Sequence, residues 1–297
     1  MKIKFYNLKI FINKRRTPIL YIDTYLWYDI LKKHQNELDL LKNCCESKLI
    51  IIALTNAIIG ELKQRNIFDE IKSICGDSLV SVPLGRISAN QVIHSMLCFF
   101  NNKNTINFDW NLAISEVPVL EKKNTGLKAI VDNLRNEMNN ANAKYYGRKE
   151  TLISIFVGLE RDVWKDALRV YGEILNNGLF ANTKKENLYD DYFLTDYFAL
   201  LPFVVIKSSL FAYLLNERPI NSQDIVDIHS LAEIMPYSTL FIMDKDQHNR
   251  FKQIQKDCPM IFDRIDDLCF LSSYLKNNKY NPLEALQSFL EYASSKE

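Results

Sequence analysis

Residues 18–23 read PILYID, and this stretch decides the fold class of the chain. It is a short apolar run that ends in a carboxylate, which is typical of a strand buried on both faces in a parallel sheet. Four later segments predict further strands: LIIIAL at 49–54, LVSV at 79–82, TLFIM at 239–243 and the short MIF at 260–262. Apolar residues at helical spacing follow the first run, over residues 24–43. This alternation predicts an α/β fold, with a central parallel sheet flanked by helices.

The composition is that of a folded, helix-rich protein. Of the 297 residues, 47% are hydrophobic and 25% are charged, which excludes intrinsic disorder over most of the length and allows a large core. The 8 Gly are few, which disfavours turn-rich all-β folds. The formal net charge of +1 gives no global indication of a nucleic-acid partner. The six Cys form no C-x-x-C pair, so we expect free thiols and a cytoplasmic protein.

The strand signal lies at both ends of the chain, and a region of helical pattern separates them. Apolar positions recur at helical spacing in three segments: 92–100, 127–146 and 150–175. Two Asn-rich segments predict loops: 101–107 and 176–187. Neither end alone has enough strands for a covered sheet. We therefore predict one core, residues 1–86 and 216–297, interrupted by an all-helical insertion, residues 87–215; two domains in series are the alternative.

Residues 198–215, FALLPFVVIKSSLFAYLL, form a long apolar stretch. About 18 residues is the lower limit for crossing a bilayer. The stretch also contains Pro202 and Lys207, and Asp196 precedes it. We therefore expect a helix buried in a large core rather than a membrane span, and no membrane partner.

Four carboxylates lie at or near the ends of the predicted strands. Asp23 follows PILYI and Asp244 follows TLFIM, so both are expected at the carboxyl edge of the sheet, where the sites of α/β proteins form. Asp246 follows Asp244 by two residues. Glu61 lies in the helix predicted after the second strand, with Thr55 as its N-cap.

Two further acids lie on a helix predicted over residues 222–235, just before the strand predicted at 239–243. Ser222 is its expected N-cap. Asp224 and Asp227 are three residues apart and share one face of this helix. Because an acid in the first turn favours the helix dipole, a structural role for Asp224 is the alternative to a role as a metal ligand.

Carboxylates gathered at one edge would repel one another and raise their own pKa values. A hard divalent cation removes this repulsion, and Mg²⁺ or Mn²⁺ binds carboxylates together with waters and phosphate oxygens. Such an ion can activate a water for attack on a phosphodiester. No P-loop, G-x-G-x-x-G, H-E-x-x-H or Ser/His/Asp order points to a different chemistry.

Three stretches carry a family resemblance. ILYIDTYLWYDI at 19–30 resembles the opening strand, Asp and helix of a PIN domain, the PilT N-terminus nuclease fold. LTNAIIGELKQ at 54–64 resembles its second motif, and NSQDIVDIHSLAEIMPYSTLFIMDKDQ at 221–247 its third and fourth. The resemblance covers about residues 20–85 and 219–265, and small members of the family have no counterpart of the insertion. It implies a parallel sheet flanked by helices and a Mg²⁺- or Mn²⁺-dependent nuclease that acts most often on RNA.

Carried over by residue, the resemblance assigns four acids to the catalytic metal site: Asp23, Glu61, Asp227 and Asp244. Asp224 competes with Asp227 for the third place, and Asp246 with Asp244 for the fourth. The function implied is an endoribonuclease, a hydrolase of single-stranded or structured RNA that leaves 5′-phosphate and 3′-hydroxyl ends; DNA is the less favoured substrate. The alternatives are a catalytically degenerate PIN-like scaffold and a toxin or defence effector that an inhibitory protein partner silences. A homo-oligomer is left open.

Two basic segments are candidates for contact with nucleic acid. Residues 144–149, KYYGRK, mix basic and aromatic side chains and are the best candidate within the insertion for contact with RNA. The basic N-terminus, residues 1–16, has two interpretations: it grips phosphates, or it is an edge strand guarded by Lys.

Overall fold

The computed structural model describes residues 8–13, 17–116, 127–176, 186–243, 245–257 and 281–295. By their internal contacts, these residues fall into two units. The helical unit takes those within 1–10, 88–106 and 115–232, and the sheet unit those within 11–87, 107–114 and 233–297. The sheet unit is thus built from both ends of the chain. The helical unit reaches residue 232, whereas the predicted insertion ends at residue 215.

The sheet unit contains four strands that pair in parallel, in the order β4-β3-β2-β6. They are β2 (Ile19–Ile22), β3 (Ile51–Thr55), β4 (Leu79–Val82) and β6 (Leu240–Ile242). Every residue of β2, β3 and β6 is buried, as expected for apolar runs without alternation. The four predicted strands that lie within the described residues are confirmed, and with them the α/β class and the parallel sheet; the strand predicted at 260–262 lies outside the described residues.

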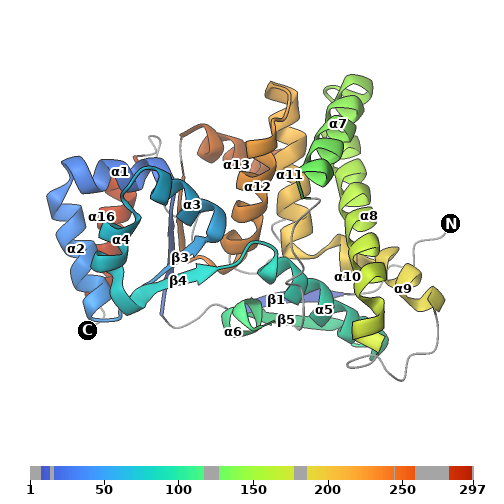
Figure 1. Cartoon of the computed structure of the whole chain (residues 1–297), viewed down its shortest axis with the longest axis horizontal. Helices are drawn as coiled ribbons and strands as arrows, with labels where there is room; N and C mark the ends of the chain where they lie inside the picture. Colours follow the sequence, from blue (N-terminus) through green and yellow to red (C-terminus); the bar gives the residue numbers. More distant parts are fainter. Residues whose placement is uncertain are drawn as a thin grey trace. The chain divides into compact units, whose positions relative to one another are not determined.

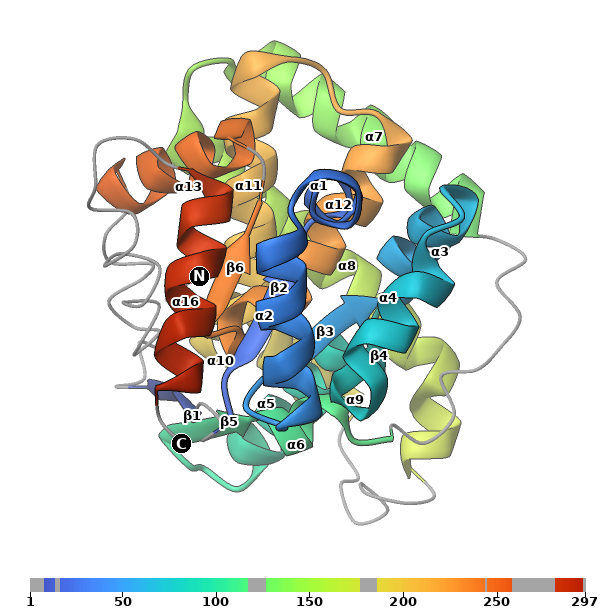
Figure 2. The same ribbon diagram turned by 90° about the vertical axis from the view of Figure 1, so that its left-hand side faces the viewer.

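Figures 1 and 2 show the helices of the sheet unit. In chain order they are α1 (Thr24–Lys33), α2 (Gln35–Glu46), α3 (Asn56–Gln64), α4 (Phe68–Cys75), α6 (Trp110–Ile114), α13 (Lys245–Asp257) and α16 (Pro282–Ser294), with 3-10 turns at Gly76–Ser78 and Met235–Tyr237. Figure 2 shows α2 between α4 and α16. Thr55 caps α3 as predicted, because its side chain accepts a hydrogen bond from the Ile58 amide.

The single helix predicted over residues 24–43 is wrong, because the chain forms two helices there. His34 separates α1 from α2, with φ −129° and ψ 67°, outside helical geometry. The helical spacing of apolar residues persists across this break, so the pattern alone does not show it. The break allows both helices to bury an apolar side, with Ile30 in α1 and Leu41 in α2 fully buried.

The helical unit consists of seven helices among its described residues: α5 (Arg86–Phe100), α7 (Leu127–Tyr145), α8 (Lys149–Asn176), α9 (Glu186–Phe193), α10 (Asp196–Ala199), α11 (Pro202–Glu217) and α12 (Ser222–Ile234). The ends of α5 and α12 extend into the sheet unit. Figure 1 shows α7, α8 and α11 side by side. Because α11 is buried from Pro202 to Leu215, the expected core helix is confirmed. No helix in the described part of the chain combines the length and apolar character that a membrane crossing requires.

The loop predicted over residues 101–107 is wrong in its second half. Residues Thr105–Asp109 form strand β5, which pairs with β1 (Lys9–Asn13) in a separate two-stranded sheet. In TINFD, buried Ile106 and Phe108 alternate with exposed residues, the period of a half-buried strand. The Asn-rich surroundings hide this short alternation. Strand β1 agrees with the strand interpretation of the basic N-terminus for residues 9–13, and most of the loop predicted at 176–187 lies outside the described residues.

Candidate functional site

The strand order changes direction between β2 and β6. From β2 the chain adds β3 and then β4 on one side, whereas β6 lies on the other side of β2. In open parallel sheets, ligands bind outside the carboxyl ends of the strands at such a point. Strands β2 and β6 are in register there, with Ile22 opposite Ile242. The residues that follow them, Asp23 and Met243, therefore mark the expected position of a site.

Asp23 is the N-cap residue of helix α1, and its backbone makes the capping contacts. Its amide donates to the Ile242 carbonyl at 3.0 Å, which extends the pairing of the two strands by one residue. Its carbonyl accepts hydrogen bonds from the amides of Leu26 and Trp27 at 3.1 and 3.2 Å. Its carboxylate makes no capping hydrogen bond to the helix, and the residue is partly exposed. A role as a helix cap therefore does not account for this acid.

Glu61 is hydrogen-bonded to the residue that follows Asp23. The Thr24 hydroxyl donates to Glu61 Oε2 at 2.9 Å, and Thr24 itself is buried. Glu61 reaches this position because α3 starts directly after β3, the strand beside β2. The structure thus brings two of the predicted acids to the same edge of the sheet.

The residue that follows β6, Met243, also contacts helix α1 at this edge of the sheet. The Tyr25 hydroxyl donates to the Met243 carbonyl at 3.4 Å. Asp244 is the next residue in the sequence and lies outside the described residues. Asp246 is exposed in the first turn of α13, and His248, two residues on, is buried. Burial lowers the pKa of His248, which favours its neutral imidazole in the folded protein.

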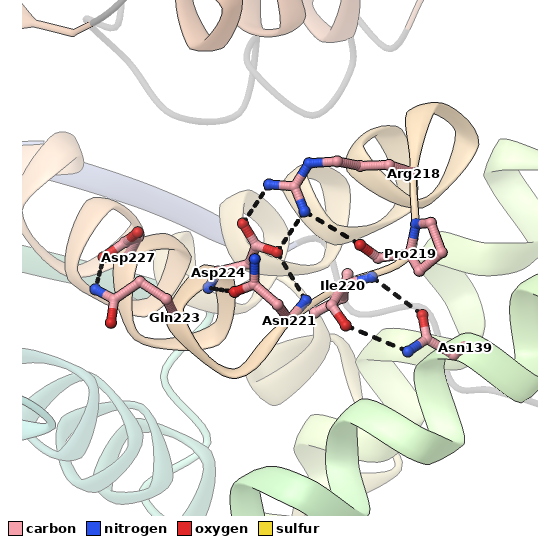
Figure 3. Close-up of polar contacts among 8 residues, drawn as sticks. All are labelled: Asn139, Arg218, Pro219, Ile220, Asn221, Gln223, Asp224 and Asp227. Carbon is pink, nitrogen blue, oxygen red and sulfur yellow. Dashed lines mark hydrogen bonds and ion pairs between the residues drawn. The ribbon is translucent and has the colours of Figure 1, made fainter.

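Asp224, in the helical unit, is held by Arg218 through both carboxylate oxygens (Figure 3). The two guanidinium–carboxylate distances are 2.7 and 2.5 Å, a bidentate pair. These hydrogen bonds raise the pKa of the Arg218 guanidinium above its ordinary value. A metal ion would have to compete with this pair for Asp224, so the structure supports the alternative in which Asp224 is a structural acid.

The predicted N-cap Ser222 is wrong by one residue, because Asn221 caps α12. Asn221 Oδ1 accepts a hydrogen bond from the Asp224 amide at 2.9 Å, and Asp224 Oδ2 accepts one from the Asn221 amide at 2.8 Å. This reciprocal pair is a capping box, and it selects the residue three positions before the acid. The Ser222 hydroxyl instead contacts Asp132 and Arg135 of α7.

Asp227 is the partly exposed acid of this helix. Its Oδ1 accepts a hydrogen bond from Gln223 Nε2 at 2.8 Å (Figure 3). Of the two acids that compete for the third place, Asp227 is the more exposed, whereas Asp224 is buried and paired with Arg218. Both belong to the helical unit, whereas Asp23, Glu61 and Asp246 belong to the sheet unit.

The described residues contain no group of three or more His, Cys, Asp or Glu that could hold a metal ion. Asp23 and Glu61 supply oxygen donors, the type that Mg²⁺ and Mn²⁺ prefer, and Asp244 would supply another. The donor chemistry fits these ions.

One acid at this edge was not among the candidate site residues predicted from the sequence. Glu233, near the end of α12, is fully buried, and its Oε2 accepts a hydrogen bond from the Gly85 amide at 3.0 Å. Gly85 has φ +88°, a conformation that glycine adopts without strain, in the loop after β4. Glu233 therefore positions a loop at the carboxyl end of a strand. The available signal was an acid within the apolar stretch SLAEIM.

A buried polar cluster in the helical unit is a second candidate. The Lys207 ammonium donates to Glu160 Oε2 at 2.6 Å and lies 3.1 Å from His229 Nδ1, while His229 Nε2 lies 3.5 Å from the Ser88 hydroxyl. An ammonium has only donors, so Nδ1 accepts and the proton of a neutral imidazole lies on Nε2, toward Ser88. The imidazole therefore cannot take a proton from Ser88, and the cluster is not a nucleophilic relay.

Comparison of the chain with protein-family models, curated proteins and solved structures gives no match.

The Lys207–Glu160 pair predicts a strong dependence of stability on charge balance. We expect Lys207→Met to lower the free energy of unfolding by about 3–5 kcal/mol, because it leaves a buried carboxylate without its cation. The double variant Lys207→Met, Glu160→Gln should recover most of the loss, since no buried charge remains. Urea unfolding measures both; strictly additive losses would contradict this account.

The capping box predicts different effects for two neighbouring residues. Asn221→Ala should lower the free energy of unfolding by about 1 kcal/mol, because it removes the side chain that caps α12. Ser222→Ala serves as the matched control and should cost clearly less. Thermal or urea unfolding of the two variants decides between them, and a larger loss for Ser222→Ala would restore Ser222 as the cap.

Proposed function

We propose that the chain is a metal-dependent nuclease with a PIN-like core, which hydrolyses phosphodiester bonds in RNA rather than DNA. The observation that carries the proposal is the position of Asp23 and Glu61. They lie at the carboxyl edge of a parallel sheet, beside the point where the strand order reverses, and Thr24 links them. The positions of both acids after neighbouring strands are expected from the sequence, and the hydrogen bond from Thr24 to Glu61 adds a contact that supports the proposal.

Each acid has a distinct role in this proposal. Asp23 supplies a carboxylate that its own helix does not use as a cap, and Glu61 either completes the oxygen-donor set or orients the attacking water. The family resemblance also assigns Asp244, which follows Ile242 by two residues in the sequence, to the metal site. The family resemblance assigns Asp227 as the fourth acid. A bound Mg²⁺ or Mn²⁺ would supply charge stabilisation at the phosphate and lower the pKa of the water that attacks it.

Helix α1 offers aromatic surface beside this edge. Tyr25 and Tyr28 are 36% and 44% exposed, and they lie one turn apart in the helix that Asp23 begins. Stacking of bases on exposed aromatic rings is a sequence-tolerant way to hold a single strand. This supports a nucleic-acid substrate, while the preference for RNA comes from the family resemblance alone.

A catalytically degenerate scaffold is the second candidate. It is favoured by the lack of a three-ligand group among the residues that the structure describes. The two candidates differ in metal binding, which a scaffold does not require.

Substitution of the edge acids tests the enzyme. We expect Asp23→Asn and Glu61→Gln each to slow the cleavage of single-stranded RNA in Mg²⁺ by at least about 100-fold, because each removes a charged oxygen ligand. Asp29→Asn is the matched control: Asp29 lies on the same helix α1, where it pairs with Lys33 on the surface, and this variant should cleave at the wild-type rate. Wild-type cleavage by Asp23→Asn would overturn the proposal.

Metal dependence separates the enzyme from the scaffold. We expect calorimetric titration with Mn²⁺ to show binding to the wild-type chain, with weaker binding to Asp23→Asn, and we expect EDTA to abolish cleavage. Asp224→Asn should leave the Mn²⁺ affinity unchanged, since Asp224 is engaged by Arg218. If the wild-type chain neither binds Mn²⁺ nor cleaves RNA or DNA, the protein is a scaffold and not a nuclease.

A further inference from the structure

The turn between α7 and α8 exposes an aromatic side chain among basic residues. Its sequence over residues 144–149 is KYYGRK, with three cations and no acid. Tyr146 is 69% exposed, the largest exposed fraction among the large hydrophobic side chains of the described residues. A single exposed aromatic is common on protein surfaces, so the inference depends on how this one is held and what surrounds it.

Asn216, at the end of α11, fixes the tip of the turn. The side-chain Oδ1 of Asn216 accepts a hydrogen bond from the Gly147 amide at 3.0 Å. The backbone carbonyl of Asn216 accepts one from the Tyr146 hydroxyl at 3.4 Å. The Asn216 side chain is itself held, because its Nδ2 donates to the Ala212 carbonyl at 2.7 Å. Gly147 has φ +77°, a conformation that other residues adopt only with strain.

The base of the turn is held against α11 as well. The Lys149 ammonium lies 4.1 Å from the centroid of the Tyr213 ring, a cation–π contact. On the α7 side, Asn142 Nδ2 donates to the Leu215 carbonyl at 2.9 Å. The turn is therefore pre-organised, and holding Tyr146 in place costs little further entropy when a ligand binds.

Exposed cations lie on both sides of Tyr146. Lys144 precedes it by two residues and Arg148 follows it by two, and both residues are exposed. Arg148 forms no ion pair with an acid in the described part of the chain. The acids nearest in sequence are Glu150, directly after the turn, and Glu137, seven residues before Lys144; Glu217 follows Asn216.

We propose that this turn binds single-stranded nucleic acid: Tyr146 stacks on a base, and Lys144 and Arg148 bind the neighbouring phosphates. A fixed aromatic ring between cations is the arrangement with which proteins hold single strands without base-specific contacts. A protein partner would need a broader apolar surface around the ring. The inference rests on the proposed function, since it assigns the nucleic-acid substrate a contact in the helical unit.

Fluorescence anisotropy of a labelled 12-nucleotide RNA tests this site on the full chain, with EDTA present to prevent cleavage. Tyr146→Ala should weaken binding about 5- to 10-fold or more, and Tyr146→Phe should keep most of the affinity, because the stacking ring remains. Arg148→Gln should weaken binding and reduce the slope of log affinity against log salt by about 0.7, the value for one phosphate contact on a single strand. Tyr292→Ala, which removes a 38% exposed Tyr from α16, is the matched control and should bind as wild type.

Heparin, a polyanion without bases, separates stacking from general charge attraction. Tyr146→Ala should leave heparin binding unchanged, whereas Arg148→Gln should weaken it. Equal RNA binding by wild type and Tyr146→Ala overturns this inference and leaves the nuclease proposal intact. RNA binding that depends on Tyr146 without any cleavage in Mg²⁺ or Mn²⁺ overturns the nuclease proposal instead. A wild-type chain that binds no RNA overturns the inference as well.

Discussion

Burial of strand β2 on both faces is the constraint on which the sheet unit depends. No residue of ILYI is more than 3% exposed, and Tyr21 stacks on Phe241 of the neighbouring strand with ring centroids 4.0 Å apart. A strand buried in this way must pair on both edges and be covered on both faces. β3 and β6 supply the pairing, and the chain can present a charged group only where the burial ends. That position is Asp23, so the same constraint that defines the core also defines the place of the candidate site.

The sheet was predictable because its strands are continuous apolar runs, a strong signal that does not depend on tertiary context. Strand β5 was missed for the opposite reason: its signal is two buried residues, Ile106 and Phe108, in a polar surrounding. The break at His34 is a tertiary effect, since the apolar spacing continues through it while the chain bends to bury both helices. The shift of the α12 cap from Ser222 to Asn221 depends on a reciprocal contact with Asp224 that a list of favourable caps does not contain.

The candidate site was predictable to the extent that strand ends determine position. Asp23 and Glu61 follow two neighbouring strands, so topology alone predicts that they share an edge. The choice between Asp224 and Asp227 was not accessible, because both lie on one helix face and the sequence does not show that Arg218 pairs with Asp224. Glu233 was not selected, although it lies in the apolar stretch SLAEIM, because its partner is the backbone amide of Gly85 and a backbone partner leaves no mark in the pattern of side chains.

The pairing of β2 with β6 has a consequence for the order of folding. Pairing of β2 with β3, and of β3 with β4, joins segments about 30 residues apart, whereas the Ile19 amide and the Thr239 hydroxyl bond across 220 positions of sequence. Closing so long a loop is slower and costs more entropy than the local pairings, so the fourth strand joins last. During synthesis the first three strands emerge long before Leu240. The edge that carries Asp23 is thus completed only after residues 240–242 have been synthesised, so the other three strands of the sheet precede the complete candidate site.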